Sequence, residues 1–407
     1  MSLGRPGLYL HVPYCSAICP YCDFAVRKGD EDKARAFTDA LIAEIRGVAE
    51  GRLLPEATDL ATAVERLAGA TFGTVYFGGG TPSILAPDDL ERLVDALRDA
   101  FDLAADTRWF LEANPEDLDA ERMASWKTLG VSMLSLGVQA LDDTTLHALG
   151  RRHSADDAIR AIERAASVGF DTVSIDLIYG LPAKDSDADP EAWGRQLDRA
   201  LALPIDHLSL YELEIHERTA FGKRHARGEL VPLDQDRRAD LFLTTHRRLA
   251  DAGWDGYEVS NFARTPEHRS AHNAKYWHHV PYLGLGPSAH SLAVDPDVGA
   301  WRFWNERLEP RWRRHLDDGL SPAAGWERLP ASALALEAAM LGLRTRDGLD
   351  LDHVERLSGI DLLATDGRRI DTWIERGWIR LDGRWLRPSA GGMAIADRLA
   401  ADLTFEG

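Results

Sequence analysis

The stretch CSAICPYC, residues Cys15 to Cys22, is the starting point for the fold, because it holds all three cysteines of the chain. Their spacing is C-x3-C-x2-C. Three thiolates on one short loop can bind a single cuboidal iron–sulfur cluster, but a four-iron cluster needs four ligands, so one iron lacks a protein donor. An open coordination position is where a metal centre binds a substrate or cofactor. The stretch therefore predicts a [4Fe-4S] cluster on Cys15, Cys19 and Cys22, with one exchangeable position.

A zinc knuckle and a disulfide pair are the alternatives for this loop. Zinc requires a second pair of Cys or His at knuckle spacing, and the neighbouring sequence has none. A disulfide would leave one of the three cysteines over. Both alternatives remain open from the loop alone, and the cluster fits its spacing better.

The composition of the chain indicates which kinds of partner it can bind and in which cellular compartment it works. The chain has 407 residues, 47 basic against 66 acidic, and a formal charge of −19, which disfavours binding to nucleic acid or to anionic lipid. The cysteine content and the absence of a secretory leader predict a reducing cytoplasm. No apolar run approaches the ~18 residues of a spanning helix, so only peripheral membrane contact through a partner is left open.

Strands and helices are expected to alternate along the first half of the chain. A strand from Leu8 to Pro13 leads directly into the cysteine loop, and the carboxyl ends of strands are where α/β barrels keep their chemistry. Helices are expected at 32–50, 120–129 and 142–149, and further strands at 74–77, 109–114, 133–139, 172–179 and 207–213. This alternation predicts an α/β fold, an incomplete (β/α)6 barrel, with an ordinary doubly wound sheet as the alternative.

Polar residues recur where these strands end. GGGTPS (Gly78 to Ser83) follows one strand, and three glycines let a backbone approach a ligand closely. Glu112, Gln139 and Asp176 lie at or near the ends of others, and a carboxylate in the apolar run around Asp176 is costly without a partner. Each signal is weak singly, since such residues often cap the next helix.

The order of these motifs along the chain resembles that of the radical SAM superfamily. The motifs are the PYC of the cysteine loop, GGGTP, LEANPE, SLGVQ, LGRRH and DLIYGLP. The resemblance is to the branch that holds oxygen-independent coproporphyrinogen III dehydrogenase and the HemW heme chaperones, and it spans nearly the whole chain. In this family S-adenosylmethionine chelates the open iron, and an electron from the cluster splits it to a 5′-deoxyadenosyl radical. The resemblance implies cofactor contacts at Tyr9, Gly79, Gly80, Thr81, Glu112, Gln139, Arg151 and Asp176, with Tyr21 against the adenine.

A second informative stretch, HNAKYW, fits the HNxxYW pattern of the HemW side of the family. A histidine beside Tyr and Trp offers a ring nitrogen for iron and aromatic surface for a porphyrin. The alternative is a packed turn that satisfies buried backbone groups. GLGPSAHS resembles a segment at the barrel mouth and adds a second histidine, whereas His278 and His279 are expected at the surface. The heme candidates are His272, Asn273, Tyr276, Trp277 and His290.

The expected domains are a radical SAM partial barrel with the cluster at 1–220, an extension with the HNxxYW motif at 221–316, and a winged-helix-like α+β domain at 317–407. A helical connector is expected at 229–253 and a linker at 317–330. Helices at 331–343, 351–358 and 367–376 should precede a hairpin turning at Asp382-Gly383 and a final helix at 392–403. The acidic chain makes a lid or docking role for the last domain more plausible than DNA binding.

Two features separate the chain from the oxidative decarboxylase of the same branch. Phe24 stands where that enzyme has a fourth cysteine, and the first strand begins without the enzyme's N-terminal extension. With HNAKYW present, the resemblance implies a heme chaperone without coproporphyrinogen III oxidase activity. It would bind the cluster, S-adenosylmethionine and heme, accept electrons from a flavodoxin or ferredoxin, and pass heme to apo-haemoproteins, respiratory ones above all. The alternatives are the decarboxylase, a radical SAM enzyme for an unrelated small substrate, and a cluster-bearing DNA-associated regulator.

Overall fold

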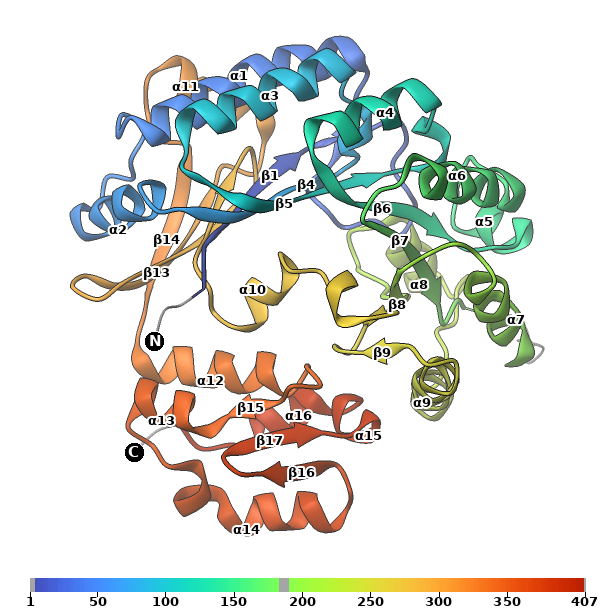
Figure 1. The fold of residues 1–407 in the computed structure, drawn as a ribbon. Coiled ribbons are helices and arrows are strands. Elements are labelled where there is room, and N and C mark those ends of the chain that lie inside the picture. The colour runs from blue at the N-terminus through green and yellow to red at the C-terminus, as the bar shows by residue number, and fades with distance from the viewer. Residues whose placement is uncertain (1–3, 183–189, 406–407) are drawn as a thin grey trace. The chain divides into compact units, whose positions relative to one another are not determined.

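The computed structural model describes residues 4–182 and 190–405, which form two compact units (Figure 1). The first unit takes its residues from Met1–Pro232 and Val280–Arg328, and the second from Leu233–His279 and Leu329–Gly407. Each unit is thus assembled from two separate stretches of chain. The expected division into three consecutive domains stays a prediction.

Six parallel strands form the framework of the first unit. They are β1 (Gly7–Val12), β4 (Phe72–Gly79), β5 (Leu103–Ala113), β6 (Val131–Gln139), β7 (Thr172–Tyr179) and β8 (His207–Glu212). They lie side by side in the order of the sequence, and every neighbouring pair is parallel. A doubly wound sheet would reverse its strand order near the middle. The expected parallel α/β fold is therefore confirmed.

Helices cover the outer face of these strands (Figure 1). Helix α1 shows why: Phe37, Leu41 and Ile45 recur at helical spacing and are fully buried, while Asp30 caps its first turn. The helices of this unit are α1 (Glu31–Ala49), α2 (Thr58–Ala68), α3 (Pro87–Ala100), α4 (Ala120–Leu129), α5 (Asp143–Ala148), α6 (Ala155–Val168), α7 (Pro190–Leu201), α8 (Ala220–Ala226) and α11 (Glu309–Asp317), with short 3₁₀ turns at Pro82–Ile84 and Pro115–Asp117.

Four more strands extend the sheet beyond β1. Strand β11 (Tyr282–Leu285) pairs with β1 in parallel, and β12 (His290–Asp295), β13 (Gly299–Asn305) and β14 (Ala323–Leu329) follow in that order. The linker expected at 317–330 is wrong over half of its length, because that half is β14. The Gly and Pro content suggested a loop, but the backbone groups of this stretch are paired at the edge of the sheet.

The second unit contains the helices and hairpin expected near the C-terminus. It comprises α9 (Gln235–Asp251), β9 (Asp255–Gly256), β10 (Asn261–Ala263), a 3₁₀ turn at Pro266–His268, α10 (Asn273–Trp277), α12 (Ala331–Gly342), β15 (Leu349–Asp350), α13 (Leu351–Ser358), α14 (Leu362–Glu375), β16 (Ile379–Asp382), β17 (Trp385–Pro388), α15 (Ala390–Met393) and α16 (Ala396–Ala401).

The C-terminal part of this unit is a winged-helix-like arrangement around one apolar core. Strands β15, β17 and β16 form an antiparallel sheet, and Val354, Trp373 and Leu386 pack in the core with the helices. The hairpin at Asp382-Gly383 is confirmed. The single final helix expected at 392–403 is wrong, since two short helices, α15 and α16, stand there. Within the described residues, every helix is too short or too polar to cross a membrane.

Candidate functional site

The cysteine loop begins where β1 ends. Strand β2 (Tyr14–Cys15) pairs in parallel with β3 (Arg27–Lys28), which closes the loop at its far end. Inside the loop, the Cys22 N–H donates to the Cys19 carbonyl at 3.1 Å. The Pro20 carbonyl accepts a hydrogen bond from the Phe221 N–H of α8 at 2.9 Å. The loop is therefore held at the carboxyl end of β1, with its three thiols free and half-buried.

Polar donors reach two of the three thiols. Thr81 Oγ1 donates to Cys15 Sγ at 3.3 Å, and Arg151 Nη1 donates to Cys19 Sγ at 3.4 Å. Burial raises the pKa of Cys15 to about 11 and raises the pKa of Cys22, and the neighbouring thiols raise both further. These contacts and the shared loop fit thiolates that bind metal, because hydroxyl and guanidinium donors stabilise a negatively charged sulfur.

In the part of the chain that the structure describes, no three His, Cys, Asp or Glu side chains are arranged to hold one metal ion. A single zinc ion requires its ligands to meet at one point. In a cuboidal cluster each thiolate binds a different iron, so the sulfur atoms do not converge on a common centre. The absence of a site for a single ion therefore does not bear on a cluster bound by this loop.

The glycines of GGGTPS bring this segment against the cysteine strand. Gly80 donates its N–H to the Val12 carbonyl at 2.8 Å, and a Cβ at Gly80 would lie 2.7 Å from the Tyr14 carbonyl oxygen. The space expected for a ligand at Gly80 is thus filled by the chain's own backbone on that side. Gly79 has φ +108°, a conformation that side chains disfavour, and its N–H donates to Glu112 Oε2 at 3.2 Å.

Two partly buried carboxylates, Glu112 on β5 and Asp176 on β7, lie close enough for their charges to interact. Burial raises the pKa of Glu112 to about 7 and that of Asp176 to about 6, and the charge of Asp176 raises the pKa of Glu112 further. Tyr76 donates its hydroxyl to Glu112 Oε1 at 2.6 Å, and Ser135 donates to Asp176 Oδ1 at 3.3 Å. A cationic ligand here would relieve the cost of two partly buried charges. Tyr76 and Ser135 were not expected from the sequence, although both lie on strands that it predicted.

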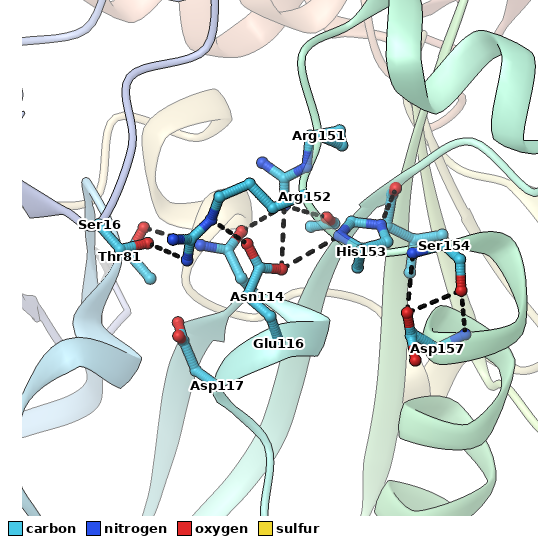
Figure 2. A network of polar contacts seen from close by, with 12 residues as sticks. Ser16, Thr81, Asn114, Glu116, Asp117, Arg151, Arg152, His153, Ser154 and Asp157 are labelled. Carbon is cyan, nitrogen blue, oxygen red and sulfur yellow. Dashed lines mark hydrogen bonds and ion pairs between the residues drawn. The ribbon is translucent and has the colours of Figure 1, made fainter.

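Arg151 links the strand ends to the cysteine loop. Its Nη2 donates to Asn114 Oδ1 at 2.6 Å and to the Gly137 carbonyl at 2.8 Å, while its buried Nε has no hydrogen-bond partner. Asn114 in turn donates to Thr81 Oγ1 at 3.0 Å (Figure 2). A buried guanidinium nitrogen without an acceptor fits a site that receives an anionic group, such as the carboxylate implied for the cofactor. Asn114 lies within LEANPE but was not singled out from the sequence.

The Glu116 carboxylate interacts with Arg151, Arg152 and His153 of the LGRRH segment (Figure 2). Burial would raise its pKa, but the hydrogen bond with His153 at 3.0 Å and the charge of Arg151 outweigh burial and lower the pKa to about 2. Arg152 lies 3.7 Å from the same carboxylate and donates to Ser16 Oγ at 2.7 Å. The segment is thereby tied to the cysteine loop by a second route.

Three other residues expected to contact the cofactor are Tyr9, Tyr21 and Gln139. Tyr9 is mostly buried, with its hydroxyl 3.0 Å from His11 Nδ1, and burial raises the pKa of Tyr9 while lowering that of His11 to about 4. Tyr21 packs its ring against Phe221, with centroids 6.2 Å apart. Gln139 has φ +68°, a strained conformation for a residue with a side chain, and such strain concentrates at functional sites.

The HNAKYW segment forms the short helix α10. His272 is 1% exposed, its Nε2 lies 2.9 Å from the Tyr276 hydroxyl, and burial lowers its pKa to about 3. Asn273 donates its N–H to Ser270 Oγ at 3.3 Å. Trp277 packs against Tyr257, with ring centroids 5.7 Å apart. The segment is thus a short packed helix, and its part in heme binding stays a prediction.

The other histidines differ in exposure. His290 at the start of β12 is exposed, packs against Trp304 with centroids 5.9 Å apart, and lies close enough to His11 to lower its pKa. His278 is exposed, as expected. The surface position expected for His279 is wrong: it is 6% exposed, and its Nε2 lies 3.5 Å from Glu337 Oε2. Of the two proposed heme ligands, His290 is thus exposed and His272 is buried, and the identity of the ligand stays a prediction.

Comparisons with known proteins identify the family of the chain. Residues 9–190 match the Radical SAM superfamily and residues 329–395 match the HemN C-terminal domain. The chain is 36% identical over 402 residues to heme chaperone HemW of Mycobacterium tuberculosis, covering 98% of this chain and 95% of the relative. It is 35% identical over 409 residues to Radical S-adenosyl methionine domain-containing protein 1, mitochondrial, of Mus musculus, covering 98% and 87%.

A solved structure has the same fold. Coproporphyrinogen III oxidase (HemN) of Escherichia coli, described as a radical SAM enzyme, matches with a TM-score of 0.79 at 22% identity, over 98% of this chain and 90% of that one. At that identity the likeness concerns the fold. The resemblance inferred from the motifs is confirmed, and the chain belongs to the HemW family of the radical SAM superfamily.

Proposed function

We propose that this protein is a heme chaperone of the reducing cytoplasm that carries a [4Fe-4S] cluster and S-adenosylmethionine and delivers heme to apo-haemoproteins, in particular respiratory ones. The observation that carries the cofactor part is the buried Arg151 Nε without a partner, beside Cys19 of a loop with three free thiols. The relatives named heme chaperone HemW support the heme part.

The cofactor site would use residues of five strands and of the segments that follow them, together with Arg151 and the cysteine loop. Cys15, Cys19 and Cys22 would hold the cluster, which supplies one-electron reduction when bound. Arg151 would orient the cofactor carboxylate, and the partly buried carboxylates would face its cationic groups. The other proposed contacts are Tyr9, Tyr21, Gly79, Gly80, Thr81, Glu112, Gln139 and Asp176.

The heme ligand we propose is His290. The residue is exposed, but its ring is partly covered by Trp304; this partial burial and the charge of Arg302 lower the pKa of His290, which favours the neutral ring that can donate a lone pair to iron. His272 would have to give up its contact with Tyr276 first. Asn273, Tyr276 and Trp277 belong to the other unit, and we propose them, with His272 in support, as a separate contact surface for a porphyrin.

The decisive experiment adds heme to the anaerobically reconstituted protein and follows the Soret band. We expect saturable binding of heme with the cluster still present, followed by transfer to an apo-cytochrome. Absence of a saturable Soret shift would contradict the chaperone and favour a radical SAM enzyme of another kind.

A second assay tests the alternative that the protein is a decarboxylase, because its fold resembles that of HemN. The reconstituted protein is incubated with coproporphyrinogen III, S-adenosylmethionine and reductant. We expect no decarboxylated porphyrin. Turnover to protoporphyrinogen would overturn the proposal that this chain lacks oxidase activity.

A further inference from the structure

A cationic groove of about 470 Å³ opens on the first unit beside the cysteine strand. Tyr14 and residues of helices α1 and α11 line the groove, together with Arg27 of β3. Four of these side chains are cationic and two are carboxylates: Arg27, Lys33, Arg313 and Arg314, with Glu309 and Asp317. The groove therefore carries a positive excess on a chain whose formal net charge is −19.

Part of this positive charge is not neutralised by the groove itself. Glu309 accepts hydrogen bonds from Arg27 at 2.7 Å and from Arg313 at 2.6 Å, so one carboxylate serves two guanidinium groups. Lys33 has an exposed ion pair with Asp30 at 3.4 Å, which is worth little in water. Among the described residues, no carboxylate lies within ion-pair distance of Arg314, whose side chain is exposed.

The groove lies next to the strand that bears the first cysteine. In the β2–β3 pair, Arg27 is opposite Tyr14, and Lys28 is opposite Cys15; paired strands lie about 4.8 Å apart. The Gly29 N–H donates to the Cys15 carbonyl at 3.0 Å. Tyr14 itself is buried, so the floor of the groove is continuous with the support of the cysteine loop.

An exposed aromatic residue precedes the groove residue Arg27 in the sequence, outside the groove lining itself. Phe24, which ends the cysteine loop three residues before Arg27, has 74% of its surface exposed. Aromatic anchors surrounded by a polar rim are typical of protein–protein interfaces. The combination of Phe24 with several cationic side chains favours a protein partner with surface carboxylates over a small anion.

We infer that this groove docks an acidic one-electron carrier protein, and the inference rests on the cluster assigned under the proposed function. The carrier would lose one electron and the centre held by the three cysteines would gain it, with no bond made or broken. Because the chain as a whole repels anionic proteins, a local cationic groove beside the cysteines would steer such a carrier to the correct face.

The test compares two charge-reversed proteins loaded with cluster. The groove variant is Lys33→Glu with Arg314→Glu. The control is Arg46→Glu with Arg164→Glu, which makes the same change of charge at exposed helical positions. Arg46 lies in the last turn of α1, as Arg314 lies in the last turn of α11. Each protein is mixed anaerobically with reduced flavodoxin, and the bimolecular rate of cluster bleaching is measured against ionic strength. Photoreduced deazaflavin serves as a small reductant that needs no docking surface.

We expect the groove variant to react with flavodoxin at least about tenfold more slowly at low salt, with the difference closing as salt screens the charges. Its iron content and its reduction by deazaflavin should match those of the parent. Equal flavodoxin rates in parent and groove variant, or an equal loss in the control, would overturn the inference. If the groove variant loses iron, Lys33→Gln with Arg314→Gln is measured in the same way and decides by the same criterion. A parent protein that binds no cluster would instead contradict the proposed function.

Discussion

Asn114 holds Arg151 in place: its Oδ1 accepts a hydrogen bond from Arg151 Nη2 at 2.6 Å, while its Nδ2 donates to Thr81 Oγ1 at 3.0 Å. Thr81 in turn donates to Cys15 Sγ. One amide thus couples the guanidinium proposed for the cofactor carboxylate to the hydroxyl beside the first cysteine. Such a buried network acts as a unit, so its central member should matter without touching the ligand.

Asn114→Ala should weaken binding of S-adenosylmethionine about tenfold, because Arg151 loses a charge-assisted hydrogen bond that orients it. Cluster content should change little, since the cysteine loop keeps its own anchors. Equilibrium binding to the reconstituted protein measures the effect, with Thr128→Ala on the exposed side of α4 as control. Unchanged affinity in Asn114→Ala would show that Arg151 needs no such support.

Replacing Cys15, Cys19 and Cys22 together by Ala should abolish the brown cluster absorbance and reduce iron from about four per chain to none. Iron analysis and visible spectra after anaerobic reconstitution measure this. A triple variant that reconstitutes normally, or a parent that purifies with zinc in place of iron, would rule out the cluster site.

Without S-adenosylmethionine, the stability contributed by Glu112 and Asp176 should fall as pH rises from about 4 towards 7, whereas the lowered pKa values of His11 and His272 act in the opposite direction. Burial raises the pKa of Glu112 to about 7 and of Asp176 to about 6, so the folded state holds protons that the unfolded state has already lost. That stabilisation is present below the unfolded pKa values and disappears as pH rises through the folded ones. Asp176→Asn should remove part of the slope, roughly 2 kcal/mol between pH 4 and 8.

Melting temperatures at pH 5 and pH 8 test this dependence for the parent and Asp176→Asn. An exposed aspartate offers the matched control in Asp236→Asn on α9, which should leave the slope unchanged. If the parent and Asp176→Asn show the same slope, the carboxylate is ionised throughout and the shift assigned to it is wrong.

Gln139→Gly should be more stable than Gln139→Ala by about 1 kcal/mol, because only glycine adopts φ +68° without strain. If the Gln139 amide contacts the cofactor, both variants should bind S-adenosylmethionine more weakly than the parent. Chemical denaturation and equilibrium binding separate the two effects. Equal stability of the two variants would mean that the backbone at this strand end relaxes out of the left-handed region.

His290→Ala should weaken heme binding about tenfold or more, whereas His278→Ala, another exposed histidine, should have little effect. His272→Ala should mainly lower the melting temperature, because it removes a fully buried ring that contacts Tyr276. Heme titrations followed at the Soret band and thermal melts distinguish these outcomes. Loss of heme affinity in His272→Ala alone, at unchanged stability, would move the proposed ligand to the HNxxYW segment.

Much of this protein could be predicted from its sequence, because the decisive signals are local. Cysteine spacing, alternating strand and helix periodicity, and the order of the strand-end motifs are written in consecutive residues, and they predicted the parallel fold, the family and the hairpin at Asp382-Gly383. The linker that proved to be β14 and the final helix that divides into α15 and α16 depend on pairing and packing with distant segments, which no local pattern reports.

Tertiary structure decided how the site is connected. Asn114, Tyr76 and Ser135 gain their importance only because neighbouring parallel strands bring them beside Arg151, Glu112 and Asp176. His279 was expected at the surface, yet it is buried beside Glu337, whereas His290 is exposed. Burial, and with it the charge state and accessibility of a side chain, is set by what the rest of the chain packs against it.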